Sequence, residues 1–267
     1  MRILRAETRQ SAEALLFVGE APRYRLPLEL RSPGEVGRYF SSLDWEQPWA
    51  AASHVSHQLV FASLNQRLFS GNQHGEPVVD EILSRFDALR DPLTGGWFAG
   101  QTAPDIVVNG AMKVFSGLQW LNRSYPDCTQ LCDFALSRPF VVDGCGFLNR
   151  LFVLYHCRKG TPEKYRQPEI FEVAEKALEI ALRFRKSDGG FSFYQERAQS
   201  VYYGAKVSRS LPESDLHGTV MVTWALGLIA EMMGLSSSDI GMFRPQGPPE
   251  FKSGPRNQAD QALPCRK

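Results

Sequence analysis

The sequence predicts an all-α fold made of helical hairpins. Apolar residues recur at spacings of three and four, or fill whole segments, throughout 79–234, which is the pattern of packed helices. Strand patterns are scarce, and only 201–203 has enough β-branched and aromatic residues to suggest a strand. Gly95-Gly96-Trp97 and Gly189-Gly190-Phe191 repeat one turn motif, so we expect the hairpins to be arranged around a common axis.

Two kinds of helix alternate along the chain. Segments 79–90, 127–138 and 168–185 have one apolar face with charged residues between, and we expect them on the outside. A short amphipathic helix at 8–18 and a loop rich in Pro, Gly and Arg at 19–38 are expected near the N-terminus. Four segments are apolar nearly all round and are expected to form the inner layer: 50–64, 105–121, 143–157 and 215–234.

Composition divides the chain of 267 residues into three parts. Residues 1–38 are expected to be an N-terminal extension and 39–241 the helical domain. Residues 242–267 are rich in Pro, Gly and polar residues, and they have too few apolar side chains to offset the entropy of ordering. A disordered C-terminal tail is therefore expected there.

Charge and hydropathy exclude several classes of function. The chain has 30 Lys and Arg against 29 Asp and Glu, with no basic block, so nucleic acid is not expected as a partner. No apolar run reaches the ~20 residues of a transmembrane helix. The N-terminus lacks the apolar core of a signal peptide, so we expect a cytoplasmic protein. The five cysteines are odd in number and lie mostly in apolar segments, which fits reduced thiols.

Polar residues within the apolar segments are the first candidates for a functional site. His54 and His57 are three apart, share one side of a helix, and can bind a metal or transfer a proton; a pair of structural histidines is the alternative. Asn109 and Lys113 are four apart on an inner segment. A buried ammonium needs a carboxylate, solvent or an anionic ligand, so Lys113 either lines a cavity or forms a structural ion pair.

Two further pairs stand where apolar helices begin. Asp215 is expected to cap a helix N-terminus, and His217 two residues later is a candidate general base or ligand. Asp143 and Cys145 stand in the same way before 146–156, although a cysteine between two glycines is also typical of a small buried residue. The expected catalytic set is His217, Asp215, His54, His57, Asn109 and Lys113.

The Gly-Gly-aromatic turns, and the motif Asp143-Gly144-Cys145 followed by His217, resemble the α/α toroid superfamily of terpenoid cyclases and protein prenyltransferase β-subunits. The resemblance covers about 45–235. It implies a barrel of helical hairpins, an isoprenoid or other long apolar substrate, and a zinc ion held by Asp143, Cys145 and His217.

The chain departs from that family in two ways. It offers about four inner helices where a closed toroid has six, so we expect a ring that is open, partial or completed by the N-terminal part, which leaves room for a protein partner. It also lacks the Asp-x-Asp-Asp acid of class II terpene cyclases, an Asp-rich motif for magnesium diphosphate, and clustered basic residues for a prenyl diphosphate.

Three functions remain open. The first is an enzyme of the terpenoid-cyclase or prenyltransferase class with a central apolar pocket. The second is a non-catalytic binding or scaffold toroid, which the missing motifs favour. The third is a toroid carbohydrate lyase or epimerase, in which tryptophans stack on sugars. The tryptophans available for such stacking are Trp45, Trp49, Trp97 and Trp120.

Overall fold

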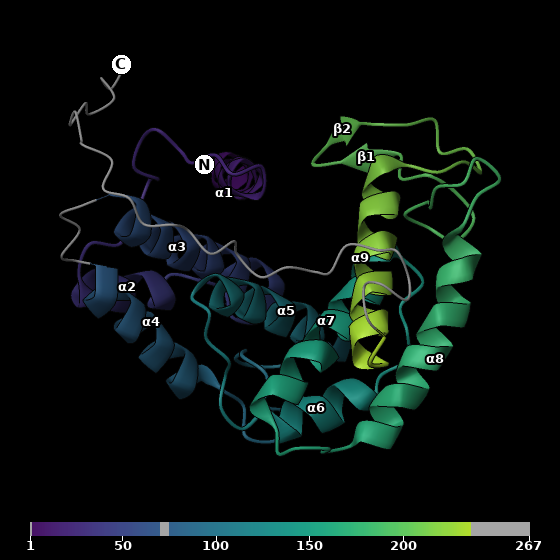
Figure 1. Ribbon diagram of the computed structural model, residues 1–267. Helices are drawn as coiled ribbons and strands as arrows, with labels where there is room; N and C mark the ends of the chain where they lie inside the picture. Colours follow the sequence, from purple (N-terminus) through teal and green to yellow (C-terminus); the bar gives the residue numbers. More distant parts are fainter. Residues whose placement is uncertain (1, 70–74, 236–267) are drawn as a thin grey trace.

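The computed structural model describes residues 2–69 and 75–235, and in these ranges the fold is all-α apart from one short β-hairpin (Figure 1). This confirms the all-α prediction. None of the described helices is long and apolar enough to cross a membrane. The predicted tail, 242–267, lies outside the described residues. The elements are α1 (Arg2–Phe17), α2 (Pro33–Ser41), α3 (Pro48–Leu68), α4 (Gly75–Leu89), α5 (Pro104–Trp120), α6 (Thr129–Leu136), α7 (Gly144–Gly160), α8 (Gln167–Phe184), β1 (Val201–Tyr202), β2 (Ala205–Lys206) and α9 (Leu216–Met232).

The helices alternate between an inner row and an outer layer. The inner row is α3, α5, α7 and α9, each packed on the next. The outer helices cover it, with α4 on α3, α6 on α7 and α8 on α9, while α2 packs on α4. All four inner helices and the three outer helices expected from the sequence are present. The most apolar helices lie inside, where most of their side chains are buried.

Each inner helix runs in the same direction as the next one in the row, but the row fans out, so that α3 and α5 lie across the view and α9 stands upright (Figure 1). The β1–β2 hairpin lies near the N-terminal end of α9, and α1 packs across α3 (Figure 1). Parallel packing is visible in contacts that stay in register along each neighbouring pair of helices. These contacts join Ser56 to Ser116 and Ser63 to Trp120 (α3 and α5), Asn109 to Asn149 (α5 and α7), and Cys145 to His217 and Tyr155 to Glu231 (α7 and α9).

The first Gly-Gly-aromatic turn shows why glycine is needed between layers. Gly95 has φ +70°, and a Cβ there would lie 2.7 Å from the backbone nitrogen of Leu131. The next residue, Gly96, passes as closely to Val107, where a Cβ would lie 2.5 Å from Cγ1. Trp97 then turns inward and is 1% exposed. Its ring packs edge-on against those of Phe86, Phe115 and Tyr125.

The N-terminal region is more ordered than the sequence suggested. Helix α1 begins at Arg2, six residues before the expected 8–18, and α2 begins at Pro33 within the stretch expected to be a loop, capped by the Ser32 side chain. The predicted boundary between 38 and 39 therefore falls inside α2. Helix α1 packs on α3 through a second core cluster that includes Leu16, Phe61 and Trp120. The N-terminal region thus belongs to the packed body.

Candidate functional site

The predicted site residues come from all four inner helices and gather near their N-terminal ends. The site is named here the mouth cluster, and it also includes residues from α1 and from the loop before α9. Its members from the inner helices are His54 and His57 (α3), Asn109 and Lys113 (α5), Cys145 (α7) and His217 (α9).

Two helix caps place Cys145 opposite His217. Asp143 caps α7 by accepting a hydrogen bond from the Gly146 amide at 2.8 Å. Asp215 caps α9 in the same way, accepting from the Gly218 amide at 2.6 Å. Cys145 and His217 each stand two residues after their cap, and Cys145 Sγ lies 4.0 Å from His217 Nε2. The structure thus joins two groups that are 72 residues apart in the chain.

The imidazole of His217 is held on three sides. Its Nδ1 lies 2.7 Å from Gln199 Oε1, which can only accept, so this contact assigns the proton to Nδ1 and leaves Nε2 as an acceptor facing the thiol. Phe193 stacks on the ring with centroids 4.8 Å apart, and Tyr202 packs against it at 5.0 Å. The arrangement is that of a nucleophile, a base and a group that orients the base.

The environment keeps this pair neutral at rest. Burial lowers the pKa of His217, although Asp215 and Asp143 act in the opposite direction. Burial and then Asp143 raise the pKa of Cys145 to about 11, and Lys113 opposes them. A neutral imidazole beside a neutral thiol can accept the thiol proton when a substrate arrives.

Asp215 has a larger structural role than a simple cap. One carboxylate oxygen accepts the Gly218 amide, and the other accepts the amides of Phe193 at 2.8 Å and Gln199 at 3.0 Å. It therefore fixes the backbone of the two residues that stack on and hydrogen-bond to His217. Asp215, which the sequence placed in the catalytic set, acts here as a positioning residue.

The predicted zinc triad is only partly assembled. Cys145 and His217 meet, whereas the Asp143 carboxylate is engaged on α7 as a cap. Within residues 2–69 and 75–235, no three His, Cys, Asp or Glu side chains are grouped so as to hold a metal ion. The contact that the structure provides is a thiol with an imidazole.

Lys113 is the cation nearest to this pair on the inner row. Its ammonium lies 5.5 Å from the ring centroid of Trp49, and no ion pair to it is found among the described residues. Burial, and next the charge of Arg9, lower its pKa to about 8. Asn109, one turn earlier, accepts a hydrogen bond from Asn149 at 2.8 Å and so ties α5 to α7. Lys113 is therefore a cation without a paired carboxylate in the described part of the chain.

His57 lies close to several cations and is buried. Burial, then Arg9 and Lys113, lower its pKa to about 3, so it is neutral at physiological pH. Its Nδ1 is buried, and no hydrogen-bond partner for it is found among the described residues. The histidine pair expected to act together is divided, because His54 contacts Arg5 instead.

Helix α1 supplies two arginines to the mouth cluster. Arg9 donates to Ser56 Oγ at 2.7 Å and to the Ser116 carbonyl at 3.3 Å, and it pairs with Glu13. It thereby connects α1 to both α3 and α5. Sequence analysis found no clustered basic residues, because this cluster is assembled from α1, α3 and α5 and has no continuous motif.

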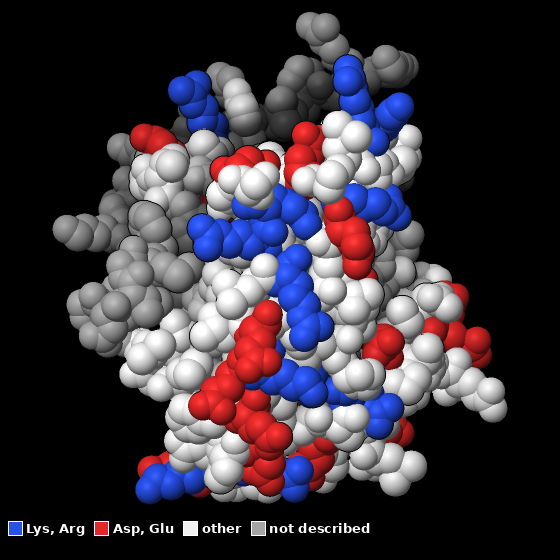
Figure 2. Space-filling view, turned by 90° about the vertical axis from the view of Figure 1, so that its right-hand side faces the viewer, with Lys and Arg blue, Asp and Glu red and all other residues white. Residues whose placement is uncertain are grey.

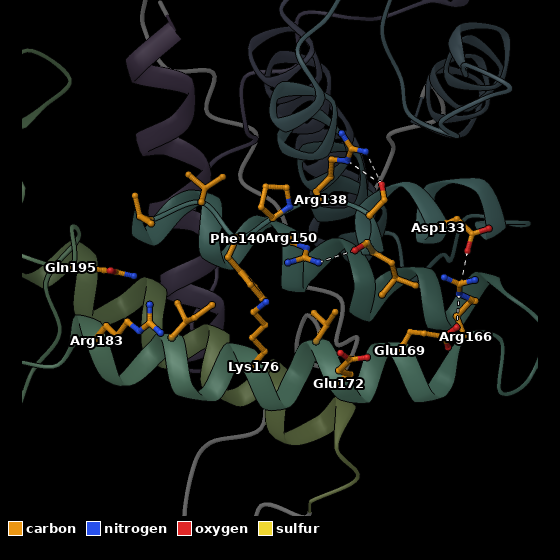
Figure 3. A pocket seen from close by; sticks show the side chains of 17 residues that line it. Asp133, Arg138, Phe140, Arg150, Arg166, Glu169, Glu172, Lys176, Arg183 and Gln195 are labelled. Carbon is orange, nitrogen blue, oxygen red and sulfur yellow. Dashed lines mark hydrogen bonds and ion pairs between the residues drawn. The ribbon is translucent and has the colours of Figure 1, made fainter.

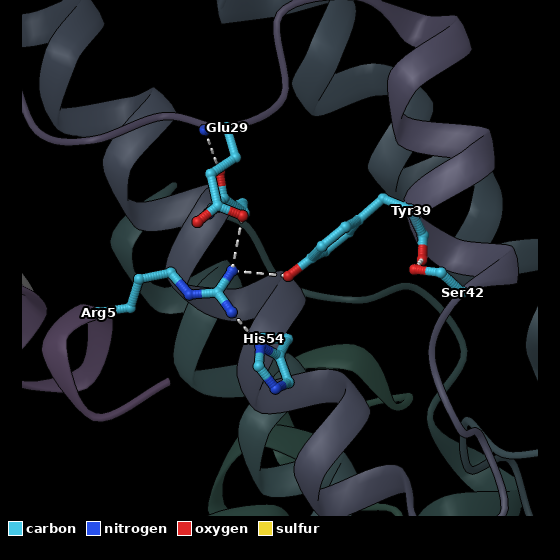
Figure 4. Close-up of polar contacts among 6 residues, drawn as sticks. Arg5, Glu29, Tyr39, Ser42 and His54 are labelled. Carbon is cyan, nitrogen blue, oxygen red and sulfur yellow. Dashed lines mark hydrogen bonds and ion pairs between the residues drawn. The ribbon is translucent and has the colours of Figure 1, made fainter. Parts of the chain in front are cut away.

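Arg5 fastens the start of α1 to the body (Figure 4). Its guanidinium lies between Glu29, Tyr39 and His54, donating to Glu29 at 3.1 Å and to Tyr39 Oη at 2.8 Å. Glu29 is itself held because its amide donates to Gln58 Oε1 at 2.9 Å. These contacts join α1, the loop before α2, α2 and α3, and they hold α1 against α3.

Apolar side chains are exposed near the same end. Trp49 is 40% exposed and Leu216 is 82% exposed, and Val220 lies one turn after Leu216 on α9. The other tryptophans expected to stack on sugars are buried core residues, because Trp45, Trp97 and Trp120 pack among aromatic and aliphatic side chains. Stacking of a sugar on these three was therefore a wrong expectation.

Comparison of the chain with protein-family models, with curated proteins and with solved structures finds no match.

Proposed function

We propose that this protein is an enzyme of the α/α-toroid class in which Cys145 is the nucleophile and His217 the general base. The observation that carries the proposal is the 4.0 Å approach of Cys145 Sγ to His217 Nε2, with Nδ1 of the same ring held by Gln199. Helix order and the Gly-Gly-aromatic turns support the toroid class: four inner helices run parallel, each preceded by an outer helix.

The pair is suited to acyl transfer. His217 Nε2 takes the thiol proton, and the Cys145 thiolate forms a bond to the carbonyl carbon of an ester or thioester. The bond to the leaving group then breaks, and His217 returns the proton to that group. Water or a second acceptor then gives a proton to His217 and bonds to the acyl carbon. The bond to Cys145 breaks, and the thiolate takes the proton back from His217.

The surroundings favour an anionic substrate with a long apolar chain. Lys113 provides a cation near Cys145 with no carboxylate paired to it among the described residues, whereas the charge of nearby Arg9 is paired with Glu13. Exposed Trp49, Leu216 and Val220 offer apolar contact beside them. A fatty acyl thioester with an anionic head group meets both requirements and has the carbonyl carbon that the mechanism needs. An isoprenoid chain, which the resemblance implies, meets only the requirement for an apolar chain.

The test is formation of a covalent acyl intermediate. Full-length protein is incubated with palmitoyl-coenzyme A, which has a long acyl chain, a thioester and a phosphate-rich head group, and intact-protein mass spectrometry follows the adduct. We expect acylation of wild type, loss in Cys145→Ala, and at least about a hundredfold slower acylation in His217→Ala. Cys132→Ser, which removes a buried thiol elsewhere, is the matched control and should acylate like wild type.

Three results would contradict the proposal in different ways. Saturable binding of the probe without any adduct would favour the non-catalytic binding toroid. Stoichiometric zinc in protein purified without added metal, lost in Cys145→Ser, would favour the metal site that the resemblance implies. An adduct that persists in Cys145→Ala would place the reactive thiol elsewhere.

A further inference from the structure

A groove on the outer face of the molecule contains a second group of basic residues, none of which belongs to the mouth cluster. It encloses about 540 Å³ between the end of α6, the loop that follows it, and α8. This volume lies within the range of small-molecule sites, about 300–1,000 Å³. Its walls combine basic side chains with Phe140, Val141, Val173 and Ile180.

The floor of the groove contains a buried guanidinium. Arg150 of α7 is 6% exposed. Its Nε donates to the Ala135 carbonyl at 2.9 Å, one terminal nitrogen donates to the Leu136 carbonyl at 3.1 Å, and its plane lies over the Phe140 ring at 4.2 Å. No carboxylate pairs with it among the described residues. These contacts cap the end of α6, and the carbonyls and the Phe140 ring offset part of the positive charge, but they provide no counter-ion for this buried guanidinium.

Further positive charges face the same space. Figure 3 shows Lys176 extending from α8 toward Arg150, while Arg183 lies near Gln195 at one end of the groove. Arg138 also lines the groove. Burial, and next the positive charge of Arg138, lower the pKa of Arg150 to about 10.

Two of the three acidic residues that line the groove form ion pairs at its other end. Asp133 and Glu169 both pair with Arg166, at 3.6 Å and 3.1 Å. Figure 3 shows these three side chains together, away from Lys176 and Arg183. Glu172, one turn before Lys176, is the remaining acid of the groove. In the space-filling view of this side, a band of basic side chains runs beside an acidic patch (Figure 2).

We propose that this groove binds a small amphipathic anion, with a phosphate or carboxylate head group against Arg150, Lys176 and Arg183 and an apolar part against Phe140, Val173 and Ile180. An anion would pair the buried guanidinium, whose terminal nitrogens can present a two-pronged contact to such a head group. The apolar wall then selects an organic anion over an inorganic one.

The experiment measures binding of hexyl phosphate to the full chain by isothermal titration calorimetry, with inorganic phosphate and hexanol as comparison ligands. Hexyl phosphate should bind wild type more tightly than either of them. The double variant Lys176→Ala/Arg183→Ala changes two exposed side chains, so it should fold normally, and it should weaken binding at least about tenfold. Glu172→Gln removes the opposing charge and should tighten binding.

Two controls test whether hexyl phosphate binds in the groove, rather than to surface charge in general or to the mouth cluster. Arg185→Ala removes an exposed arginine just beyond α8 that does not line the groove, and binding should stay within about twofold of wild type. Lys113→Met removes the cation of the mouth cluster, where an anion with an apolar chain is also expected to bind, so this variant should retain the binding that depends on Lys176 and Arg183. The proposal is overturned if wild type shows no saturable binding, if the double variant binds like wild type, or if only Lys113→Met weakens binding.

Discussion

Asp215 and Asp143 cap two parallel inner helices, yet we expect them to respond differently to the same substitution. Asp215 accepts three backbone amides with its two oxygens, whereas one backbone amide, that of Gly146, donates to Asp143. An asparagine at 143 can keep its one bond. At 215 an asparagine must turn its NH₂ group toward at least one amide donor, because both oxygens of the aspartate are in use.

The magnitude follows from these bonds. A hydrogen bond to a charged group contributes about 1.5–3 kcal/mol. Asp215→Asn loses one such bond and weakens two, so it should lower the free energy of unfolding by about 2–4 kcal/mol, and Asp143→Asn by less than about 1 kcal/mol. For a domain of this size, 1 kcal/mol changes Tm by about 2–4 °C, which gives a loss of about 4–16 °C for Asp215→Asn.

The assay is urea denaturation of both variants and wild type, followed by circular dichroism at pH 7. Equal losses in the two variants, within about 0.5 kcal/mol, would refute the reasoning that the three-amide network distinguishes Asp215 from an ordinary cap. Acylation by the probe should also fall in Asp215→Asn, since the carboxylate positions the backbone of Gln199, which orients His217.

Two further predictions concern stability. Gly218→Ala should lower the free energy of unfolding by more than about 3 kcal/mol, because a Cβ there would lie 2.2 Å from the backbone of Phe193. Gly34→Ala, where a Cβ would have no atom closer than 3.9 Å, is the control. Equal Tm values of the two variants in thermal denaturation would contradict the expected clash. Burial lowers the pKa of His156 to about 3 from 6.5, so the folded state resists protonation and stability should fall as pH drops below 6.5 toward 3. Wild type should lose about 2–3 kcal/mol of its free energy of unfolding between pH 6.5 and 4.5 through this histidine, and His156→Phe should not. Urea denaturation at each pH measures the loss, and the same pH dependence in the variant would show that His156 is not responsible.

The helices could be predicted from the sequence because each one carries its own pattern of burial. The segment 215–234 is apolar on all sides and becomes α9, while 168–185 has one apolar face and becomes α8. Helix α2 was missed, because nine residues with two glycines and a proline have little intrinsic helical signal and depend on packing against α4.

Part of the candidate site could also be predicted, because caps and apolar helices fix where Cys145 and His217 stand. The partner of His217 could not, since Gln199 lies in an irregular loop whose backbone is placed by Asp215 from 16 residues away. Arg9 was missed for a similar reason: its contact with Ser116 spans 107 residues, and nothing local in the sequence records it. The chemistry of a side chain can be predicted from the local sequence, whereas contacts between distant loops and helices depend on tertiary packing.

The parallel direction of the inner helices has an electrostatic consequence for the mouth cluster. Each helix has a macrodipole equivalent to about half a positive charge at its N-terminus. At α7 and α9 the carboxylates of Asp143 and Asp215 offset this charge, whereas α3 has no acidic residue in its first turn and its Trp49 ring lies 5.5 Å from the Lys113 ammonium. An approaching anion is therefore drawn toward Lys113 partly by the peptide groups of α3, which no pH change can neutralise, and its association should slow as added salt screens that field.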